Sequence, residues 1–228
     1  MVRAAIFDLD GLLVDSEPLW RRVQVEVFGA LGLALGPADC AATTGLRIDE
    51  VVRTRYAWTP WEGPSRGEVV DRIVDRMVAL VAAEGVVLPG AREAVETCRV
   101  AGLALALASS SHERLIRASL ARLGLADAFA VVSSAERERW GKPHPAVFLT
   151  TLARLGVDPG EAVVFEDSLH GVIAAKAARA RCVAVPAAEA RDDPRFALAD
   201  HVLASLEEVD PALLRRLGAG RRATPEAP

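Results

Sequence analysis

Two carboxylates stand two residues apart, directly after the first apolar segment of the chain. Residues 4–15 read Ala-Ala-Ile-Phe-Asp-Leu-Asp-Gly-Leu-Leu-Val-Asp. Asp8 and Asp10 would point to the same side, because residues i and i+2 of an extended chain share a face. Two acids that leave a buried strand together repel each other unless a cation lies between them. The pair therefore predicts a site for a hard cation such as Mg²⁺, with an Asx-turn as the local alternative.

A serine run follows a later apolar segment and suits a phosphate. Ala-Ser-Ser-Ser occupies residues 108–111. We expect Ser110 and Glu113 to form a capping box for the following helix, which leaves Ser109 free. A hydroxyl beside a helix N-terminus can hold a phosphoryl oxygen.

A lysine occurs in a proline-stiffened loop, Gly-Lys-Pro-His-Pro at residues 141–145. The chain contains 27 lysines and arginines, and only Lys142 and Lys176 are lysines, which suggests that a compact ammonium is needed at position 142. In the functional interpretation Lys142 enters the acidic site, offsets the carboxylates and contacts phosphate. In the alternative interpretation Lys142 is a solvated loop residue. Pro145 is expected to begin the next helix.

A second acidic pair lies in Phe-Glu-Asp-Ser-Leu-His-Gly, residues 165–171. Asp167 would complete the Mg²⁺ site, with Glu166 nearby. Acids at a helix N-terminus can instead serve only as caps.

Apolar runs typical of buried strands alternate with helical patterns through most of the chain. The expected strands are Val2–Phe7, Leu103–Ala108, Ala130–Ser133, Ala162–Phe165, Cys182–Val185 and His201–Leu203. The expected helices between them are Ala91–Ala101, Glu113–Leu123, Pro145–Leu155 and Leu169–Ala178. This alternation predicts an α/β fold with a doubly wound, Rossmann-like parallel sheet, whose ligands bind at the carboxyl ends of the strands. Asp8, Ser109, Lys142 and Asp167 all fall at or just beyond such ends.

The region between the first two strands contains helical patterns only. We expect helices at Leu19–Leu31, Asp49–Ala57 and Arg66–Glu84. We therefore predict an all-helical cap domain over residues 16–85, inserted into a discontinuous core of residues 1–15 and 86–228. Hinges are expected near residues 13–16 and 86–89, and residues 218–228 read as a loose polar tail.

Bulk composition limits the function classes. Of the 228 residues, 51% are hydrophobic and 25% charged, which is typical of a globular enzyme. A net charge of −4 gives no support to nucleic-acid or membrane-surface binding. Three widely spaced cysteines, with no targeting or membrane segment in view, indicate a cytoplasmic protein. A monomer is the expected state.

The four motifs together resemble the haloacid dehalogenase superfamily. Phe-Asp-Leu-Asp-Gly, Ala-Ser-Ser, Gly-Lys-Pro and Glu-Asp-Ser occur in that family's order and spacing, and the resemblance extends to about residue 205. The inserted helices are similar to its C1 cap. Residues 12–20, 44–49 and 60–66 resemble the corresponding segments of bacterial hexitol and 2-deoxyglucose-6-phosphate phosphatases.

The resemblance implies a Mg²⁺-dependent phosphoric monoester hydrolase that acts on small phosphorylated sugars or polyols. Asp8 would be the nucleophile that forms an aspartyl-phosphate. Asp10 would protonate the leaving sugar oxygen and then activate water. Mg²⁺ would be held by the Asp8 carboxylate, the Asp10 carbonyl and Asp167, and Glu166 would lie in the first or second shell of ligands.

The same resemblance assigns the phosphate contacts. Ser109, the backbone of Ser110 and Lys142 would hold the transferring phosphoryl group. Arg47 follows a Gly-Leu turn near the expected cleft and is a candidate for the polar end of the substrate, with a solvated surface arginine as the alternative.

Other chemistries of the superfamily can be weighed on single residues. Dehalogenases lack the second aspartate, and phosphonate hydrolases use a cap lysine that is missing here. A sugar phosphomutase of the β-phosphoglucomutase type remains the alternative, but that mutase has a cap histidine where this chain has Trp20. Trp20, Trp58 and Trp61 could line the cleft or pack in a core.

Overall fold

Six parallel strands form one sheet in the computed structural model, which describes residues 1–43 and 45–219. The sheet order is β3-β2-β1-β4-β5-β6. The strands are β1 (Ala4–Phe7), β2 (Ala104–Ser109), β3 (Val131–Ser134), β4 (Ala162–Glu166), β5 (Arg181–Ala184) and β6 (His201–Val202). Each predicted strand is present with ends shifted by at most two residues, and the predicted doubly wound α/β class is confirmed.

Helices cover both faces of the sheet, and β1 is buried on both sides. Ala5 and Phe7 face a cluster formed with α5 (Ala91–Val100), α6 (Glu113–Leu123) and α9 (Pro211–Ala219). Ala4 and Ile6 face the opposite cluster, formed with α7 (Ala146–Leu155) and α8 (Leu169–Ala177). A strand that is apolar on both faces is typical of a parallel sheet, so the alternation along the sequence predicted this architecture correctly.

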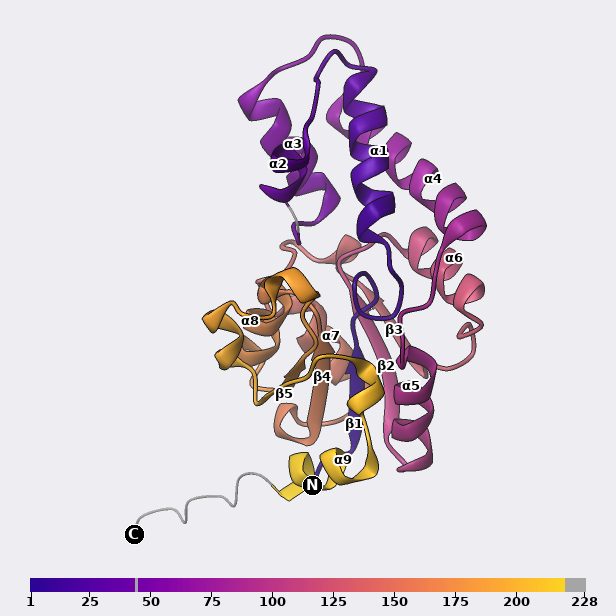
Figure 1. Cartoon of the computed structure of the whole chain (residues 1–228), viewed down its shortest axis with the longest axis vertical. Coiled ribbons are helices and arrows are strands. Elements are labelled where there is room, and N and C mark those ends of the chain that lie inside the picture. The colour runs from indigo at the N-terminus through magenta and orange to yellow at the C-terminus, as the bar shows by residue number, and fades with distance from the viewer. Residues whose placement is uncertain (44, 220–228) are drawn as a thin grey trace.

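Helices α1 to α4 follow β1 and form a separate group. They are α1 (Glu17–Gly29), α2 (Pro37–Ala41), α3 (Ile48–Trp58) and α4 (Arg66–Glu84). Figure 1 shows β1 running from the N-terminus toward this group, so the group covers the carboxyl ends of the strands. It has its own apolar cluster, which includes Val23, Val52 and Ile73 and also Leu115 of α6. This separate cluster supports the proposed division into a cap (16–85) and a core.

The two connections to this group pair with each other. The amide of Asp15 donates to the carbonyl of Val86 (2.9 Å), and the amide of Leu88 donates to the carbonyl of Leu13 (3.0 Å). Both segments were predicted as hinges from sequence. The two segments that connect this helical group to the rest of the chain are therefore hydrogen-bonded to each other.

Short 3₁₀ helices lie in the loops at Ala135–Arg137, Pro159–Glu161, Ala188–Ala190, Pro194–Leu198 and Leu206–Glu208. Two α-helices, α2 and α9, were not predicted. The predicted tail overlaps α9 at residues 218–219, and the rest of it lies outside the described residues. Within residues 1–43 and 45–219, no helix combines the length and hydropathy that a membrane crossing requires.

Candidate active site

Asp8 lies immediately beyond the end of β1 and is almost completely buried. Its amide donates to the carbonyl of Phe165 (3.0 Å), which extends the pairing of β1 with β4. The chain then turns sharply at Gly11, whose φ is +77°, a conformation that favours glycine. A Cβ on Gly11 would lie 2.2 Å from Oδ2 of Asp167, so the turn packs directly against that carboxylate.

Lys142 joins the acids of the first and last motifs. Its Nζ donates to Oδ1 of Asp8 (2.6 Å), to Oε1 of Glu166 (2.5 Å) and to the carbonyl of Ala108 (3.1 Å). Burial alone would lower the pKa of Lys142, but the charges of Asp8 and Glu166 outweigh it and raise this pKa. Lys142 is therefore an ammonium held among the buried acids, and the solvated alternative is wrong. Its contact with phosphate stays a prediction.

Glu166 is fully buried and both of its oxygens accept hydrogen bonds. Oε2 accepts from the amide and hydroxyl of Ser168 (3.2 and 3.1 Å). The Ser168 hydroxyl also accepts from the amide of Gly171 (3.0 Å), so Ser168, and neither acid, caps α8. A Cβ on Gly171 would lie 1.8 Å from the Glu166 carboxyl carbon. The start of α8 thus fixes the side chain that holds Lys142.

Asp8, Glu166 and Asp167 form an acidic cluster whose charge is only partly balanced. Each offers one oxygen within 4.8 Å of the others. Burial raises the pKa of Asp8 to about 7, opposed by Lys142 and reinforced by Glu166 and Asp10. Burial, then the charges of Glu166 and Asp8, also raise the pKa of Asp167 well above its usual value. Buried carboxylates in excess of one ammonium are a donor set that fits a hard divalent cation.

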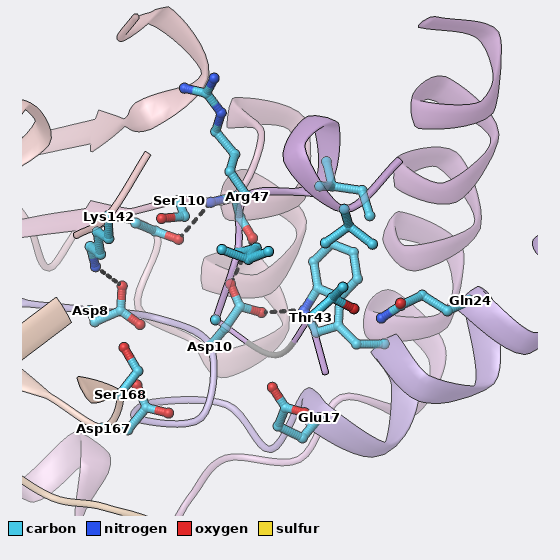
Figure 2. A pocket seen from close by; sticks show the side chains of 17 residues that line it. Asp8, Asp10, Glu17, Gln24, Thr43, Arg47, Ser110, Lys142, Asp167 and Ser168 are labelled. Carbon is cyan, nitrogen blue, oxygen red and sulfur yellow. Dashed lines mark hydrogen bonds and ion pairs between the residues drawn. The ribbon is translucent and has the colours of Figure 1, made fainter. Parts of the chain in front are cut away.

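Asp10 is held by three donors from two segments. Its Oδ1 accepts from the Ser16 hydroxyl (2.7 Å) and from the Trp20 indole N–H (3.1 Å). Its Oδ2 accepts from the Ser111 hydroxyl (2.7 Å). Figure 2 shows Asp10 between Asp8 and Thr43, along the wall of one cavity. The carboxylate is therefore positioned jointly by the start of α1 and by the serine run after β2.

The serine run differs from its prediction in one respect. The capping box expected from Ser110 and Glu113 is wrong, because α6 has His112 at its N-cap position and the amide of Glu113 donates to the side chain of Glu136 (2.9 Å). The Ser109 hydroxyl is also engaged, since it accepts from the amide of Ser111 (3.0 Å). The Ser110 hydroxyl is buried and has no hydrogen-bond partner among the described residues.

Arg47 is buried, and its guanidinium is committed to protein groups. Nη1 donates to the carbonyls of Ala135 (2.7 Å) and Glu138 (2.8 Å), while Nε and Nη2 donate to the Asp49 carboxylate. Figure 2 shows the guanidinium pointing away from Asp8. The solvated alternative is therefore wrong. The contact with a substrate stays a prediction, because in this conformation Arg47 ties the cap group to the loop after β3.

The cavity between the two parts has a volume of about 110 Å³. Its walls are polar on the sheet side and mixed on the side of α1, residue 43 and residues 45–51. The lining residues are Asp8, Asp10, Glu17, Trp20, Gln24, Thr43, Gly45, Leu46, Arg47, Ile48, Val51, Ser109, Ser110, Ser111, Lys142, Asp167 and Ser168. Trp20 lines the cavity, which is one of the two alternatives that the sequence left open. Trp61 is instead packed against Phe28 and Tyr56, and Trp58 is 59% exposed.

Several contributors to the site were missed from sequence. Ser111 and Gly11 stand inside the motifs but received no role, and Ser168 follows the second acidic pair. Their positions within or beside the motifs are the sequence signal that could have identified them. Gln24 was missed because it lies outside the four motifs, in the helix that follows the first of them.

The chain is similar to known phosphatases along most of its length. A sequence model of the haloacid dehalogenase-like hydrolases matches residues 2–179. Hexitol phosphatase B of Escherichia coli K12 is 49% identical over 209 residues, which cover 91% of this chain and 94% of that protein. The crystal structure of CbbY from Rhodobacter sphaeroides in complex with phosphate is 30% identical, with a TM-score of 0.83 over 92% of this chain and 96% of that one. The structure of β-phosphoglucomutase from Clostridium difficile, at 21% identity, has a TM-score of 0.81 over 95% of this chain and 97% of that chain and shares the fold.

Proposed function

The chain belongs to the haloacid dehalogenase-like hydrolases and is a phosphatase, and we propose that it hydrolyses small sugar or sugar-alcohol phosphates with Mg²⁺ through an aspartyl-phosphate. The contact that carries the proposal is the buried ion pair of 2.6 Å between Asp8 and Lys142, inside a cluster of further carboxylates. The Lys142 ammonium lies beside the Asp8 carboxylate, where it can neutralise the charge of a phosphate dianion before Asp8 attacks phosphorus. The 49% identity to a hexitol phosphatase supports a phosphorylated polyol as substrate, with 2-deoxyglucose 6-phosphate as a further candidate.

In the first step, an Asp8 oxygen forms a bond to phosphorus while the bond between phosphorus and the sugar oxygen breaks. Lys142 already fixes Oδ1 of Asp8, so the carboxylate is oriented before substrate arrives. Asp10 gives a proton to the leaving sugar oxygen, which departs as an alcohol. Because the Asp8 carboxylate is already held in one orientation, less entropy is lost on reaching the transition state, which lowers the activation free energy.

In the second step, Asp10 takes a proton from water, the water oxygen bonds to phosphorus, and the bond to Asp8 breaks to release phosphate. Ser16 and Ser111 can follow this proton cycle, because a hydroxyl donates to the charged form of Asp10 and accepts from the protonated form. The Trp20 N–H is a donor in both states. The two serines thus suit Asp10 for use as acid and base in turn.

Mg²⁺ would be held by the carboxylates of Asp8 and Asp167 together with the Asp10 carbonyl. When bound, it would supply positive charge that stabilises the phosphoryl oxygens. Both oxygens of Glu166 already accept hydrogen bonds, which favours an indirect role in which Glu166 positions Lys142.

The phosphoryl group would be held by Lys142 and by the segment of Ser109 and Ser110. Arg47 would contact the polar end of the substrate. The unpartnered Ser110 hydroxyl supports this assignment, since a buried hydroxyl without a partner lacks a hydrogen bond that a phosphoryl oxygen can supply. Arg47 would have to leave its present carbonyl partners to reach a substrate.

The test is release of inorganic phosphate, with and without Mg²⁺, from 2-deoxyglucose 6-phosphate, hexitol phosphates and β-glucose 1-phosphate. We expect Mg²⁺-dependent release from the 6-phosphates. Conversion of β-glucose 1-phosphate to the 6-phosphate with little free phosphate would instead support the phosphomutase, the second candidate. Trp20 favours hydrolysis, because its indole donates to Asp10 and offers no titratable nitrogen there.

A further inference from the structure

Gln24 carries a buried side-chain amide on the cap side of the cavity. It belongs to α1, is 9% exposed and lines the cavity. Its Oε1 makes no hydrogen bond with any residue in the described part of the chain. An unsatisfied buried polar atom lowers the stability of the fold, so its presence calls for a compensating role.

Two other polar residues on this wall, Thr43 and Arg47, are already engaged in hydrogen bonds. The Thr43 hydroxyl donates to the carbonyl of Cys40 and accepts from Arg55, and Arg47 binds Asp49 and two backbone carbonyls. Gln24 therefore remains as a hydrogen-bonding group on the cap side that can receive a ligand without breaking a contact.

The helix geometry aims Gln24 into the cavity. Glu17, Trp20 and Gln24 follow the i, i+3, i+7 spacing, which places them on one face of α1. Trp20 in the middle contacts Asp10, so this face borders the reacting centre. Figure 2 shows Gln24 at the end of the cavity away from Asp8, with its amide directed toward Thr43 and Asp10.

We propose that Gln24 is a specificity-determining residue that hydrogen-bonds a hydroxyl group of the substrate, on the carbon chain away from the phosphate. A carboxamide presents one acceptor and one donor group, which matches a hydroxyl that both donates and accepts. The neighbours Leu46, Ile48 and Val51 are apolar, so these three side chains offer a hydroxyl no competing hydrogen bond. This inference rests on the proposed function and states which feature of the substrate the cap side recognises.

The test compares two substrates of the same reaction. Gln24→Met keeps the length of the side chain and removes both hydrogen-bonding groups. We expect the ratio of kcat/KM for a hexitol 6-phosphate to kcat/KM for p-nitrophenyl phosphate, which carries no aliphatic hydroxyl, to fall about 10- to 100-fold. Most of the loss should lie in KM for the hexitol phosphate.

Two controls and a second variant separate specificity from structure. Glu26→Met alters the outer face of the same helix, where Glu26 pairs with Arg76, and should leave the ratio unchanged. Urea unfolding of Gln24→Met should give a stability equal to or above that of the wild type, because an unpartnered amide is removed. Gln24→Leu provides a second shape and should lower the ratio in the same way.

The outcomes are distinct. A wild type that hydrolyses hexitol phosphates, with Gln24→Met and Gln24→Leu retaining its substrate ratio, would overturn the inference and leave the proposed function intact. A Gln24→Met protein that is clearly less stable than the wild type would assign the residue to packing and also overturn it. A wild type that releases phosphate from no substrate would remove the proposed function and this inference together.

Discussion

Lys142 balances two buried carboxylates, so its removal should affect folding and catalysis together. In Lys142→Met, Asp8 and Glu166 lose their shared cation. We expect a loss of about 3–5 kcal/mol in the free energy of unfolding and a fall in kcat of about 10²–10³-fold. Urea unfolding and phosphate release measure the two effects.

The matched control is the other lysine of the chain. Lys176 pairs with Asp200 at a partly exposed site, and Lys176→Met should lower stability by no more than about 1 kcal/mol and keep kcat. Equal behaviour of the two variants would contradict the role given to Lys142.

Gly11 supports the proposed metal site because it has no side chain, which leaves room for the Asp167 carboxylate. Gly11→Ala would place a methyl group against the Asp167 carboxylate, whereas Gly102→Ala would meet nothing at nearly the same φ of +78°. Both variants should lose about 1–2 kcal/mol from the left-handed backbone, measured by urea unfolding. Only Gly11→Ala should also lower kcat and raise the Mg²⁺ concentration needed for half-maximal activity. Equal kcat values in the two variants would count against this placement of Asp167.

Sequence reasoning succeeded for residues whose partners are set by strand ends. Parallel strands end at one edge of the sheet, so the residues that follow these strands meet there, namely Asp8, Lys142, Glu166 and Asp167. The strands can be recognised in a single sequence, and their ends can therefore be predicted to lie together. Sequence reasoning failed for Ser110, where a local capping pattern was outweighed by Glu136, which lies 23 residues from the amide it accepts from. Contacts of this kind depend on how loops meet and leave no local pattern.

At the scale of elements, Arg47 links α3 to the loop after β3. Arg47→Ala would remove its hydrogen bonds to Ala135 and Glu138, worth about 1 kcal/mol each. We expect amide hydrogen exchange of the linkers, residues 13–16 and 86–89, to rise roughly tenfold without substrate. The exposed α3 residue Arg53, changed to alanine, is the control. Unchanged exchange combined with a higher KM would instead favour direct contact of Arg47 with substrate.

Element boundaries were predicted well where an amphipathic pattern is long. The ends of α4 and α6 were predicted to the residue, because each carries several turns with one apolar face. The five-residue α2 was missed, since so short a segment shows no periodicity. α9 was missed because its apolar face packs on α5 and the sheet, a contact that the local sequence does not indicate.

At the scale of the whole molecule, metal binding should stabilise the fold. A cation that binds the folded state at about 100 times its Kd adds about 2.7 kcal/mol, or roughly 5–10 °C in Tm for a chain of this size. We expect Mg²⁺ to raise Tm relative to EDTA in the wild type and in the exposed control Asp127→Asn, and not in Asp167→Asn. The same Tm rise in Asp167→Asn would contradict the proposed ligand set. A monomer and a cytoplasmic location stay predictions.

The covalent intermediate on Asp8 is the centre of the mechanism, and the Asp10→Asn variant with p-nitrophenyl phosphate tests it most directly. This leaving group needs no proton, so the first step should proceed while the second, which needs Asp10 as base, stalls. We predict a burst of one nitrophenol per enzyme and a protein that carries one phosphoryl group, located by peptide mass spectrometry on Asp8. The double variant with Asp8→Asn should show neither. Linear nitrophenol release with no phosphoryl group on the protein, or a phosphoryl group on another residue, would contradict the account.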